Sequence, residues 1–254
     1  MSQPANAPDQ NITAGLDEST LERINPDNTA EQGATGVETL KLHLARYEFA
    51  AANLRSGSVL DIACGVGYGT DLLSRSPSVR RVVGVDLDAA AIAYAQQRYP
   101  SPISEFVCAD AMTFAPGEIF QTIVSLETME HVPDPEALFA RLVYFLAPGG
   151  VLISSVPVTL STDANPHHAT DFTETSFRRL GARAGLRVVG EFRQIQPYSP
   201  LALLRKTEIR AQGVRRGLAG YYLRHPDKLA LRCWTTVRYG FENRYLTVAW
   251  EKPA

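Results

Sequence analysis

The stretch from residue 59 to residue 69 constrains the fold of this chain more than any other part of the sequence. It begins as a short apolar strand pattern, Val59-Leu60-Asp61-Ile62, and continues into a loop with glycine at positions 65, 67 and 69. A helical pattern starts directly afterwards, at Thr70. Glycine lets the backbone adopt positive φ and approach a ligand closely, and the first turn of a helix presents N–H groups without partners inside the helix. We therefore expect a strand, a ligand-binding loop and a helix in succession.

An acidic residue at the end of the next apolar strand indicates which class of ligand the loop binds. That strand is Val82-Val83-Gly84-Val85, and Asp86 follows it directly. A carboxylate at this point is the usual partner of a ribose hydroxyl, so the pattern predicts an adenosine-bearing cofactor. Asp61 precedes the glycines, where a carboxylate suits an ammonium or sulfonium group and opposes a pyrophosphate, which prefers bare N–H donors. The sequence thus argues against a nicotinamide dinucleotide.

Strand and helix patterns alternate through most of the chain. We expect helices over 37–54, 68–75, 88–98, 134–146 and 172–184, and strands over 57–63, 80–85, 104–108, 120–126, 151–156, 186–193 and 245–250. A turn is expected at Ala147-Pro148-Gly149-Gly150. Short apolar strands that alternate with helices predict βαβ units and a parallel sheet, so the fold class is α/β. The crossovers should be right-handed.

Two acidic residues and a histidine follow the strand at 120–126. On a helical turn, positions i, i+3 and i+4 share a face, so Glu127, Glu130 and His131 should converge. Two carboxylates and an imidazole suit Mg²⁺, Mn²⁺, Fe²⁺ or Zn²⁺. The segment 165–174, which follows the next strand, offers a further histidine ligand at 167 or 168. Other readings remain open: Glu130 and His131 as helix caps or as acid and base, and the downstream histidine as a metal-independent base or a solvated surface residue.

Length and composition indicate one α/β domain with additions. The chain has 254 residues, of which 45% are hydrophobic, enough for a packed core. No apolar run approaches the roughly 20 residues that span a bilayer, and residues 1–10 lack the apolar centre of a signal peptide. The three cysteines form neither a disulfide framework nor a zinc pattern. We therefore expect a cytoplasmic protein.

The charges are distributed unevenly. Residues 197–254 hold eleven Lys and Arg against four Asp and Glu, whereas residues 1–196 hold fourteen against twenty-three. A basic, mostly helical insertion with aromatic residues accounts for the excess at 198–241. It suits a sugar phosphate, a nucleotide-linked sugar or a glycan, or it is a solvated helical face. The overall pI of about 6.2 argues against a nucleic-acid partner.

The stretch 59–69, with Asp61 ahead of the glycines and Asp86 beyond them, resembles the first motif of the class I S-adenosylmethionine (SAM) methyltransferases. The resemblance covers about residues 37–196 and the last strand. It implies a Rossmann-like, seven-stranded sheet with helices on both faces and an antiparallel last strand. We divide the chain into a flexible N-terminal segment (1–36), a SAM-binding core (37–197), a basic helical cap (198–241) and the last strand of the core (242–254). The segments at 22–26 and 43–49 resemble an N-terminal lid over the SAM pocket in related bacterial enzymes.

The resemblance also implies roles for individual residues. Asp61 and the glycine loop would hold the methionine part of SAM, Asp86 the ribose, Leu87 the adenine face, and Asp110 with the N–H of Ala111 the adenine edge. The expected cofactor-binding residues are Asp61, Ala63, Gly65, Gly67, Gly69, Asp86, Leu87, Asp110, Ala111 and Glu127. For Asp86 and Asp110, a helix N-cap is the alternative.

The segment Glu127-Thr128-Met129-Glu130-His131 resembles a box found in small-RNA 2′-O-methyltransferases and in O-methyltransferases of ubiquinone biosynthesis. In the RNA enzymes this box and a later histidine bind a divalent metal. The resemblance implies Glu127, Glu130, His131 and His168 as metal ligands, and Glu130, His131 and His168 as catalytic residues. Nothing in this chain resembles the RNA-binding additions of those enzymes.

The sequence therefore predicts a SAM-dependent O-methyltransferase for a hydroxyl of a sugar, glycan or other polar small metabolite, assisted by Mg²⁺ or another divalent metal. Two alternatives remain: a metal-independent N- or C-methyltransferase, and a SAM-binding module without catalysis. The oligomeric state stays open, a homodimer included.

Overall fold

The structure is a computed structural model, and it describes residues 25–27, 33–198, 215 and 217–254. The expected flexible N-terminal segment therefore lies mostly outside the described residues. The same holds for four basic residues of the expected cap, Arg205, Lys206, Arg210 and Arg216. Within the described part of the chain, no helix is long and apolar enough to cross a bilayer.

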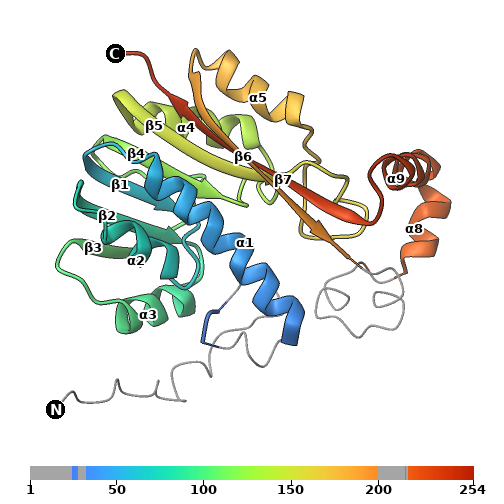
Figure 1. Cartoon of the computed structure of the whole chain (residues 1–254), viewed down its shortest axis with the longest axis horizontal. Helices are drawn as coiled ribbons and strands as arrows, with labels where there is room; N and C mark the ends of the chain where they lie inside the picture. The colour runs from blue at the N-terminus through green and yellow to red at the C-terminus, as the bar shows by residue number, and fades with distance from the viewer. Residues whose placement is uncertain (1–24, 28–32, 199–214, 216) are drawn as a thin grey trace.

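Seven strands form one sheet in the order β3-β2-β1-β4-β5-β7-β6 (Figure 1). The strands are β1 (Gly57–Ile62), β2 (Val79–Asp86), β3 (Ser104–Cys108), β4 (Phe120–Leu126), β5 (Leu146–Pro157), β6 (Arg187–Pro197) and β7 (Glu242–Glu251). β7 runs antiparallel to both of its neighbours, whereas β1 to β5 pair in parallel. The predicted α/β sheet with an antiparallel last strand is confirmed.

Helices cover both faces of this sheet. They are α1 (Gly33–Ala52), α2 (Tyr68–Ser74), α3 (Ala89–Arg98), α4 (Pro135–Phe145), α5 (Glu174–Arg183), α8 (Leu218–Arg224) and α9 (Pro226–Tyr239). One apolar cluster joins α1 and α2 to one face, through residues such as Tyr47, Leu73 and Val124. A larger cluster joins α4 and α5 to the other face, through residues such as Leu142, Phe177 and Trp250. Two buried faces explain why the central strands read as apolar runs rather than alternating patterns.

The expected turn at 147–150 is wrong, because β5 already begins at Leu146. Leu146 pairs with Phe120, and the next pair joins Thr122 to Val151, so the intervening residues form an irregularity within the strand. Gly149 N donates to Lys252 O, and Lys252 N donates to Gly150 O. These bonds to the chain beyond β7 hold the residues in the sheet, and Gly149 supplies the one positive φ that they need, 71°.

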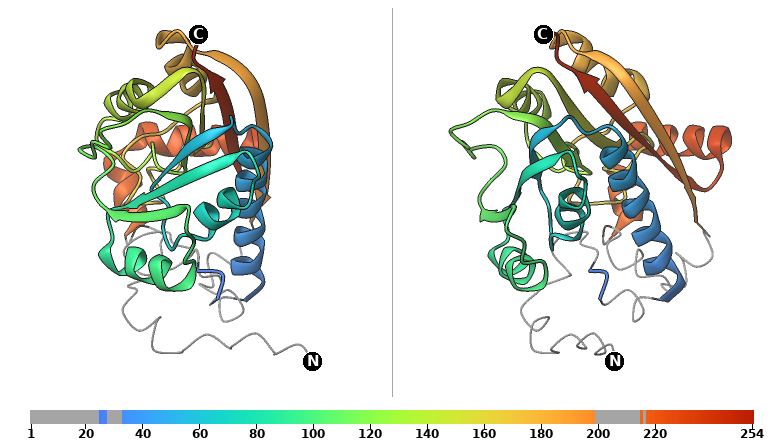
Figure 2. Two further views of the ribbon diagram at one scale, coloured as in Figure 1. Left: turned by 90° about the vertical axis from the view of Figure 1, so that its left-hand side faces the viewer. Right: turned by 60° about the vertical axis from the view of Figure 1, so that its left-hand side comes forward.

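The sheet order places the candidate site. The order reverses next to β1, which pairs with β2 on one side and β4 on the other. Ligands of open α/β sheets bind outside the carboxyl ends of the strands at such a point. Figure 2 shows α1 running along the molecule beside these strands, and in Figure 1 α8 and α9 lie past the end of the sheet, next to the start of β7.

Candidate functional site

The three glycines of the loop after β1 have different structural roles. Gly65 has φ 56°, and a Cβ there would meet no described atom within 4 Å. A Cβ on Gly67 would lie 2.6 Å from the Cβ of Ala95, and one on Gly69 would lie 1.9 Å from the ring of Tyr47. Gly67 and Gly69 are therefore required by packing, whereas Gly65 leaves room for a ligand beside the backbone.

Asp61 is fully buried beneath this loop. Thr70 Oγ1 donates a hydrogen bond of 2.6 Å to Asp61 Oδ2, and the Tyr47 hydroxyl lies 3.4 Å from both carboxylate oxygens. Burial raises the pKa of Asp61 to about 7, although both hydroxyls lower it in part, and the nearby charge of Asp86 raises it further. A cationic group beside Asp61 would therefore stabilise the ionised form of this buried carboxylate.

Asp86 connects the end of β2 to the glycine loop. Its Oδ2 accepts a hydrogen bond of 2.8 Å from Gly65 N, and its Oδ1 accepts one of 3.0 Å from Asp88 N. The N-cap of α3 is Asp88, whose side chain accepts from Ala90 N, so Asp86 is not the cap. Leu87 is 67% exposed beside it. Asp86 therefore fixes the loop conformation in which Gly65 is open.

The chain after β3 lies beside the end of β2. Ala109 N donates to Asp86 O, and Asp110 Oδ1 accepts a hydrogen bond of 2.8 Å from Met112 N. Asp110 thus closes a short turn, and Ala111 packs against the core. Asp110 and Ala111 follow β3, and Leu87 follows β2, which pairs with β3. The predicted adenine contacts assume that these two strand ends are neighbours. Ala63, with φ 61°, lies in the glycine loop itself.

Arg46 of α1 is a buried cation at this end of the sheet. Its side chain is 1% exposed, its guanidinium lies 4.4 Å from the centre of the Tyr245 ring, and its Nη2 lies 3.8 Å from Glu127 Oε2. Its Nε and Nη1 have no hydrogen-bond partner among the described residues. Buried polar groups are normally paired, so Arg46 has two donors suited to an anionic group of a ligand.

Glu127, directly after β4, faces Arg46 and Ser155. Its N–H donates to the carbonyl and hydroxyl oxygens of Ser155, whose hydroxyl donates a bond of 2.6 Å to Glu127 Oε1. Glu127 also has φ 48°, a left-handed conformation that few non-glycine residues adopt. These bonds hold it at the end of β4, beside Arg46.

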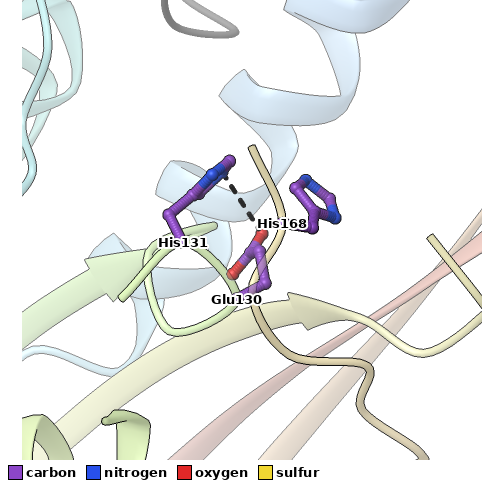
Figure 3. Close-up of side chains that lie close together, drawn as sticks. All are labelled: Glu130, His131 and His168. Atoms are coloured by element: carbon purple, nitrogen blue, oxygen red, sulfur yellow. Dashed lines mark ion pairs between the residues drawn. The ribbon is translucent and has the colours of Figure 1, made fainter. Parts of the chain in front are cut away.

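Glu130, His131 and His168 form a compact cluster (Figure 3). One potential ligand atom from each of them lies within 4.8 Å of the other two. The His131 and His168 rings are 4.7 Å apart and nearly perpendicular, and His131 Nε2 is 4.0 Å from Glu130 Oε1. One carboxylate and two imidazoles are a ligand set for a transition metal.

Hydrogen bonds from one loop fix this cluster. The β5–α5 loop (residues 158–173) carries His168, and its Ala169 N donates a bond of 2.7 Å to Glu130 O. His131 Nδ1 lies 3.2 Å from His167 O, and His168 Nδ1 lies 2.7 Å from Ser161 Oγ. In each ring, Nδ1 has a backbone or hydroxyl partner, an arrangement typical of metal-binding histidines.

The structure brings together three of the four expected ligands and leaves Glu127 outside the cluster. The expectation assumed a helical turn over 127–131, but these residues form bends and turns, and α4 begins only at Pro135. The cap of α4 is Asp134, whose side chain accepts from Ala137 N, so Glu130 and His131 are not the cap. His168, not His167, completes the cluster.

Three hydroxyls of the site were not identified from the sequence: Thr70 at Asp61, Ser155 at Glu127, and Ser161 at His168. Thr70 directly follows the glycine loop, and this position was the one available signal. Ser155 and Ser161 contact residues that are 28 and 7 positions away in the chain. No local pattern marks such contacts.

Comparison with known proteins identifies related sequences. A family model described as "Methyltransferase domain" matches residues 40–191. A probable S-adenosylmethionine-dependent methyltransferase of Mycolicibacterium smegmatis is 30% identical over 158 residues, 58% of each chain. A trans-aconitate 2-methyltransferase of Paracidovorax citrulli is 36% identical over 129 residues, 50% of this chain and 46% of that protein. The chain thus matches about half the length of these curated relatives.

Solved structures show the same fold. The N-methyltransferase NodS of Bradyrhizobium japonicum, crystallised with S-adenosyl-L-homocysteine, aligns with a TM-score of 0.58 at 18% sequence identity, over 84% of this chain and 87% of NodS. At this identity the likeness concerns the fold alone.

Proposed function

Because this chain belongs to the methyltransferase domain family, we propose that it is a SAM-dependent O-methyltransferase that acts on a hydroxyl of a sugar, a glycan or another polar metabolite, with a divalent metal beside the acceptor. The observation that carries the O-methylation and the metal is the cluster of Glu130, His131 and His168. The residues that would bind the cofactor are separate from this cluster, and most lie at the ends of β1, β2 and β3.

The end of β1 fits the methionine part of SAM. Gly65 leaves space beside the backbone, and the buried carboxylate of Asp61 suits an ammonium group, directly or through water. Arg46 offers two buried donors to a carboxylate. SAM supplies a methyl group on a sulfonium, so the chain must mainly align the acceptor with that methyl.

The ends of β2 and β3 fit the adenosine part. Asp86, held by Gly65 N and Asp88 N, would accept hydrogen bonds from the ribose hydroxyls. Leu87, an exposed apolar side chain, would pack on the adenine ring. Asp110 and the N–H of Ala111 would bind its edge.

A hydroxyl acceptor must lose its proton as the methyl group is transferred. Glu130, His131 and His168 would hold a divalent metal, which lowers the pKa of a hydroxyl bound to it. Glu130 is 1% exposed, so its carboxylate is screened from water. His167 O contacts Nδ1 of His131 and Ser161 Oγ contacts Nδ1 of His168, and these contacts orient both rings.

The composition of the cluster changes the expected metal. With Glu127 outside it, two of the three ligands are imidazoles. Imidazole suits Fe²⁺ and Zn²⁺ better than Mg²⁺, which prefers oxygen ligands and retains several waters. Mn²⁺ is a transition metal that also suits the carboxylate of Glu130. We therefore propose a transition metal in place of Mg²⁺.

In the part of the cap that the structure describes, fewer cations are available to an acceptor than the composition indicates. Arg215, Lys228 and Arg232 bond to carbonyls or carboxylates of the β5–α5 loop. Arg224 bonds to Gly220 O, and Arg238 to the Tyr239 hydroxyl. These engagements favour an uncharged polyol over a polyanion as the acceptor.

Calorimetric titration with S-adenosylhomocysteine tests the donor. We expect one site per chain, and the absence of binding would overturn the proposal. Arg46→Met should weaken that binding while the variant remains folded, as judged by circular dichroism.

A screen of polyols and sugars with radiolabelled SAM tests the acceptor and the metal together. Transfer should stop after chelation and return with Mn²⁺. His168→Ala should abolish the metal-dependent transfer, whereas His167→Ala, one residue away and outside the cluster, should retain it. Full activity after exhaustive chelation would remove the metal from the proposal and leave a metal-independent methyltransferase.

A further inference from the structure

A buried ion pair joins the cap to the loop that carries His168. Asp163 of the β5–α5 loop is fully buried, and Arg232 of α9 binds both of its oxygens, Nε to Oδ2 at 2.8 Å and Nη2 to Oδ1. The Tyr222 hydroxyl of α8 donates to the same carboxylate at 2.5 Å. A buried carboxylate is costly without such partners, so Arg232 and Tyr222 stabilise the loop on this path.

Other residues of the cap strengthen the attachment. Arg232 Nη2 also donates to Leu160 O at 2.8 Å. Arg215 donates to the carbonyls of Thr162 and Asp163, and its own N–H donates to Ala164 O. The cap thus binds a continuous stretch of the loop, residues 160–164, through backbone as well as side-chain atoms.

A second carboxylate extends this attachment toward His168. Asp171 accepts bonds from the backbone N–H groups of Ser161 and Thr162, and Lys228 Nζ of α9 lies 3.2 Å from its Oδ2. The Ser161 hydroxyl lies 3.4 Å from Asp171 Oδ1 and 2.7 Å from His168 Nδ1. Asp171, Ser161 and His168 therefore form a chain of hydrogen bonds.

The direction of this chain follows from the groups involved. The hydrogen bonds around Asp171 and its contact with Lys228 keep its pKa below the ordinary value, against the effect of burial, so it remains an acceptor. The Ser161 hydroxyl then donates to Asp171 and accepts from His168 Nδ1–H. The proton on Nδ1 leaves the lone pair of the ring on Nε2, which is the nitrogen that can bind a metal.

We propose that the α8–α9 cap is a positioning element for His168. Arg232 and Lys228 fix the two carboxylates of the β5–α5 loop, and Asp171 sets the tautomer of His168 through Ser161. This inference rests on the proposed function in one respect: the Nδ1–H tautomer matters because it leaves the Nε2 lone pair of His168 for the proposed metal. In this role Arg232 and Lys228 serve the reaction by holding the loop.

The tautomer can be measured without metal, SAM or acceptor. The full chain, labelled with ¹⁵N-histidine and treated with a chelator, is examined by imidazole NMR at pH 8. His168→Gln assigns the signals of His168. In the unchanged protein we expect one tautomer, with the proton on Nδ1.

Arg232→Ala should replace that state with a mixture of both tautomers, and Arg238→Ala is the matched control. Arg238 lies on the same helix and carries the same charge, but it bonds to Tyr239 and, among the described residues, makes no hydrogen bond to the loop. Tyr222→Phe removes a single hydrogen bond to Asp163. It replaces Arg232→Ala in the same measurement if that variant does not fold. Binding of S-adenosylhomocysteine reports that the core is intact.

Two results would overturn the proposal: a proton on His168 Nε2 in the unchanged protein, or an unchanged Nδ1 tautomer in the folded Arg232→Ala and Tyr222→Phe variants. Neither result decides whether the chain binds a metal or transfers a methyl group, because the chelation and transfer experiments test those points separately. Conversely, failure of the unchanged protein to bind metal would defeat the proposed function, while the tautomer experiment still decides the role of the cap.

Discussion

Replacement of Asp61 by asparagine should remove the contribution of one buried carboxyl to the pH dependence of stability. Asp61 is fully buried, and its pKa rises from an ordinary value of 3.8 to about 7 on folding. The folded state therefore holds more protons than the unfolded state between these two pH values. Since stability falls with rising pH wherever the folded state binds more protons, ionisation of Asp61 destabilises the cofactor-free protein as the pH rises through this range.

The magnitude follows from the two pKa values. Their difference corresponds to about 4 kcal/mol of unfolding free energy, at about 1.4 kcal/mol per pH unit. About 2 kcal/mol of this falls between pH 5 and pH 7, because the folded carboxyl is half ionised at pH 7. The buried neighbours Tyr47 and Cys64 stay neutral in this window, because burial raises the pKa of each well above its ordinary value.

The assay is urea denaturation of the cofactor-free protein and of Asp61→Asn at pH 5, 6, 7 and 8. The asparagine retains an oxygen for Thr70 and carries no charge, so its stability lacks this dependence on pH. We expect the variant to gain about 3 kcal/mol relative to the unchanged protein between pH 5 and 8. A difference that stays constant over this range would refute the reasoning, because other titrating groups cancel in the comparison.

Three further predictions concern the cofactor site. The affinity for S-adenosylhomocysteine, measured by calorimetry, should fall as the pH drops below about 7, because protonation of Asp61 removes a partner of the cofactor ammonium; in Asp61→Asn the affinity should be lower and independent of pH over that range. Arg46→Met should weaken the same binding by about tenfold or more, since a hydrogen bond to a charged group contributes about 1.5–3 kcal/mol, and an unchanged Kd would exclude Arg46 from the cofactor site. Gly69→Ala should destabilise the protein by about 1–3 kcal/mol or more in denaturant unfolding, because its Cβ would lie 1.9 Å from the Tyr47 ring; Gly220→Ala, where the nearest atom is 3.9 Å away, is the control and should not destabilise.

The fold could be predicted from the sequence because its signals are local. The alternation of apolar strands with helices, and the glycine loop between Asp61 and Asp86, each lie within a few tens of residues. They predict the largely parallel α/β sheet that the structure shows. The same pattern could not separate the roles of the glycines, because the need for Gly69 arises from Tyr47, on a helix that precedes the loop.

The arrangement of Glu130, His131 and His168 was harder to predict because it depends on turns. The convergence of Glu127 with Glu130 and His131 required a helix. The positive φ of Glu127 and its bonds to Ser155, on the neighbouring strand, prevent it. The attachment of the cap to the loop joins Asp163 to Arg232, 69 residues apart, and no periodicity encodes such a contact. The basic composition of the cap was visible, but not that its cations bind the protein's own loop.

The central claim is that Glu130, His131 and His168 hold a divalent metal at the acceptor end of the site. Pulsed electron paramagnetic resonance of Mn²⁺ bound to the ¹⁵N-histidine-labelled chain measures the ligands directly. We predict one Mn²⁺ per chain with two coordinated histidine nitrogens, one of which is lost in His168→Ala and retained in His167→Ala. Mn²⁺ that binds without histidine coupling, or that does not bind at all, would contradict this account.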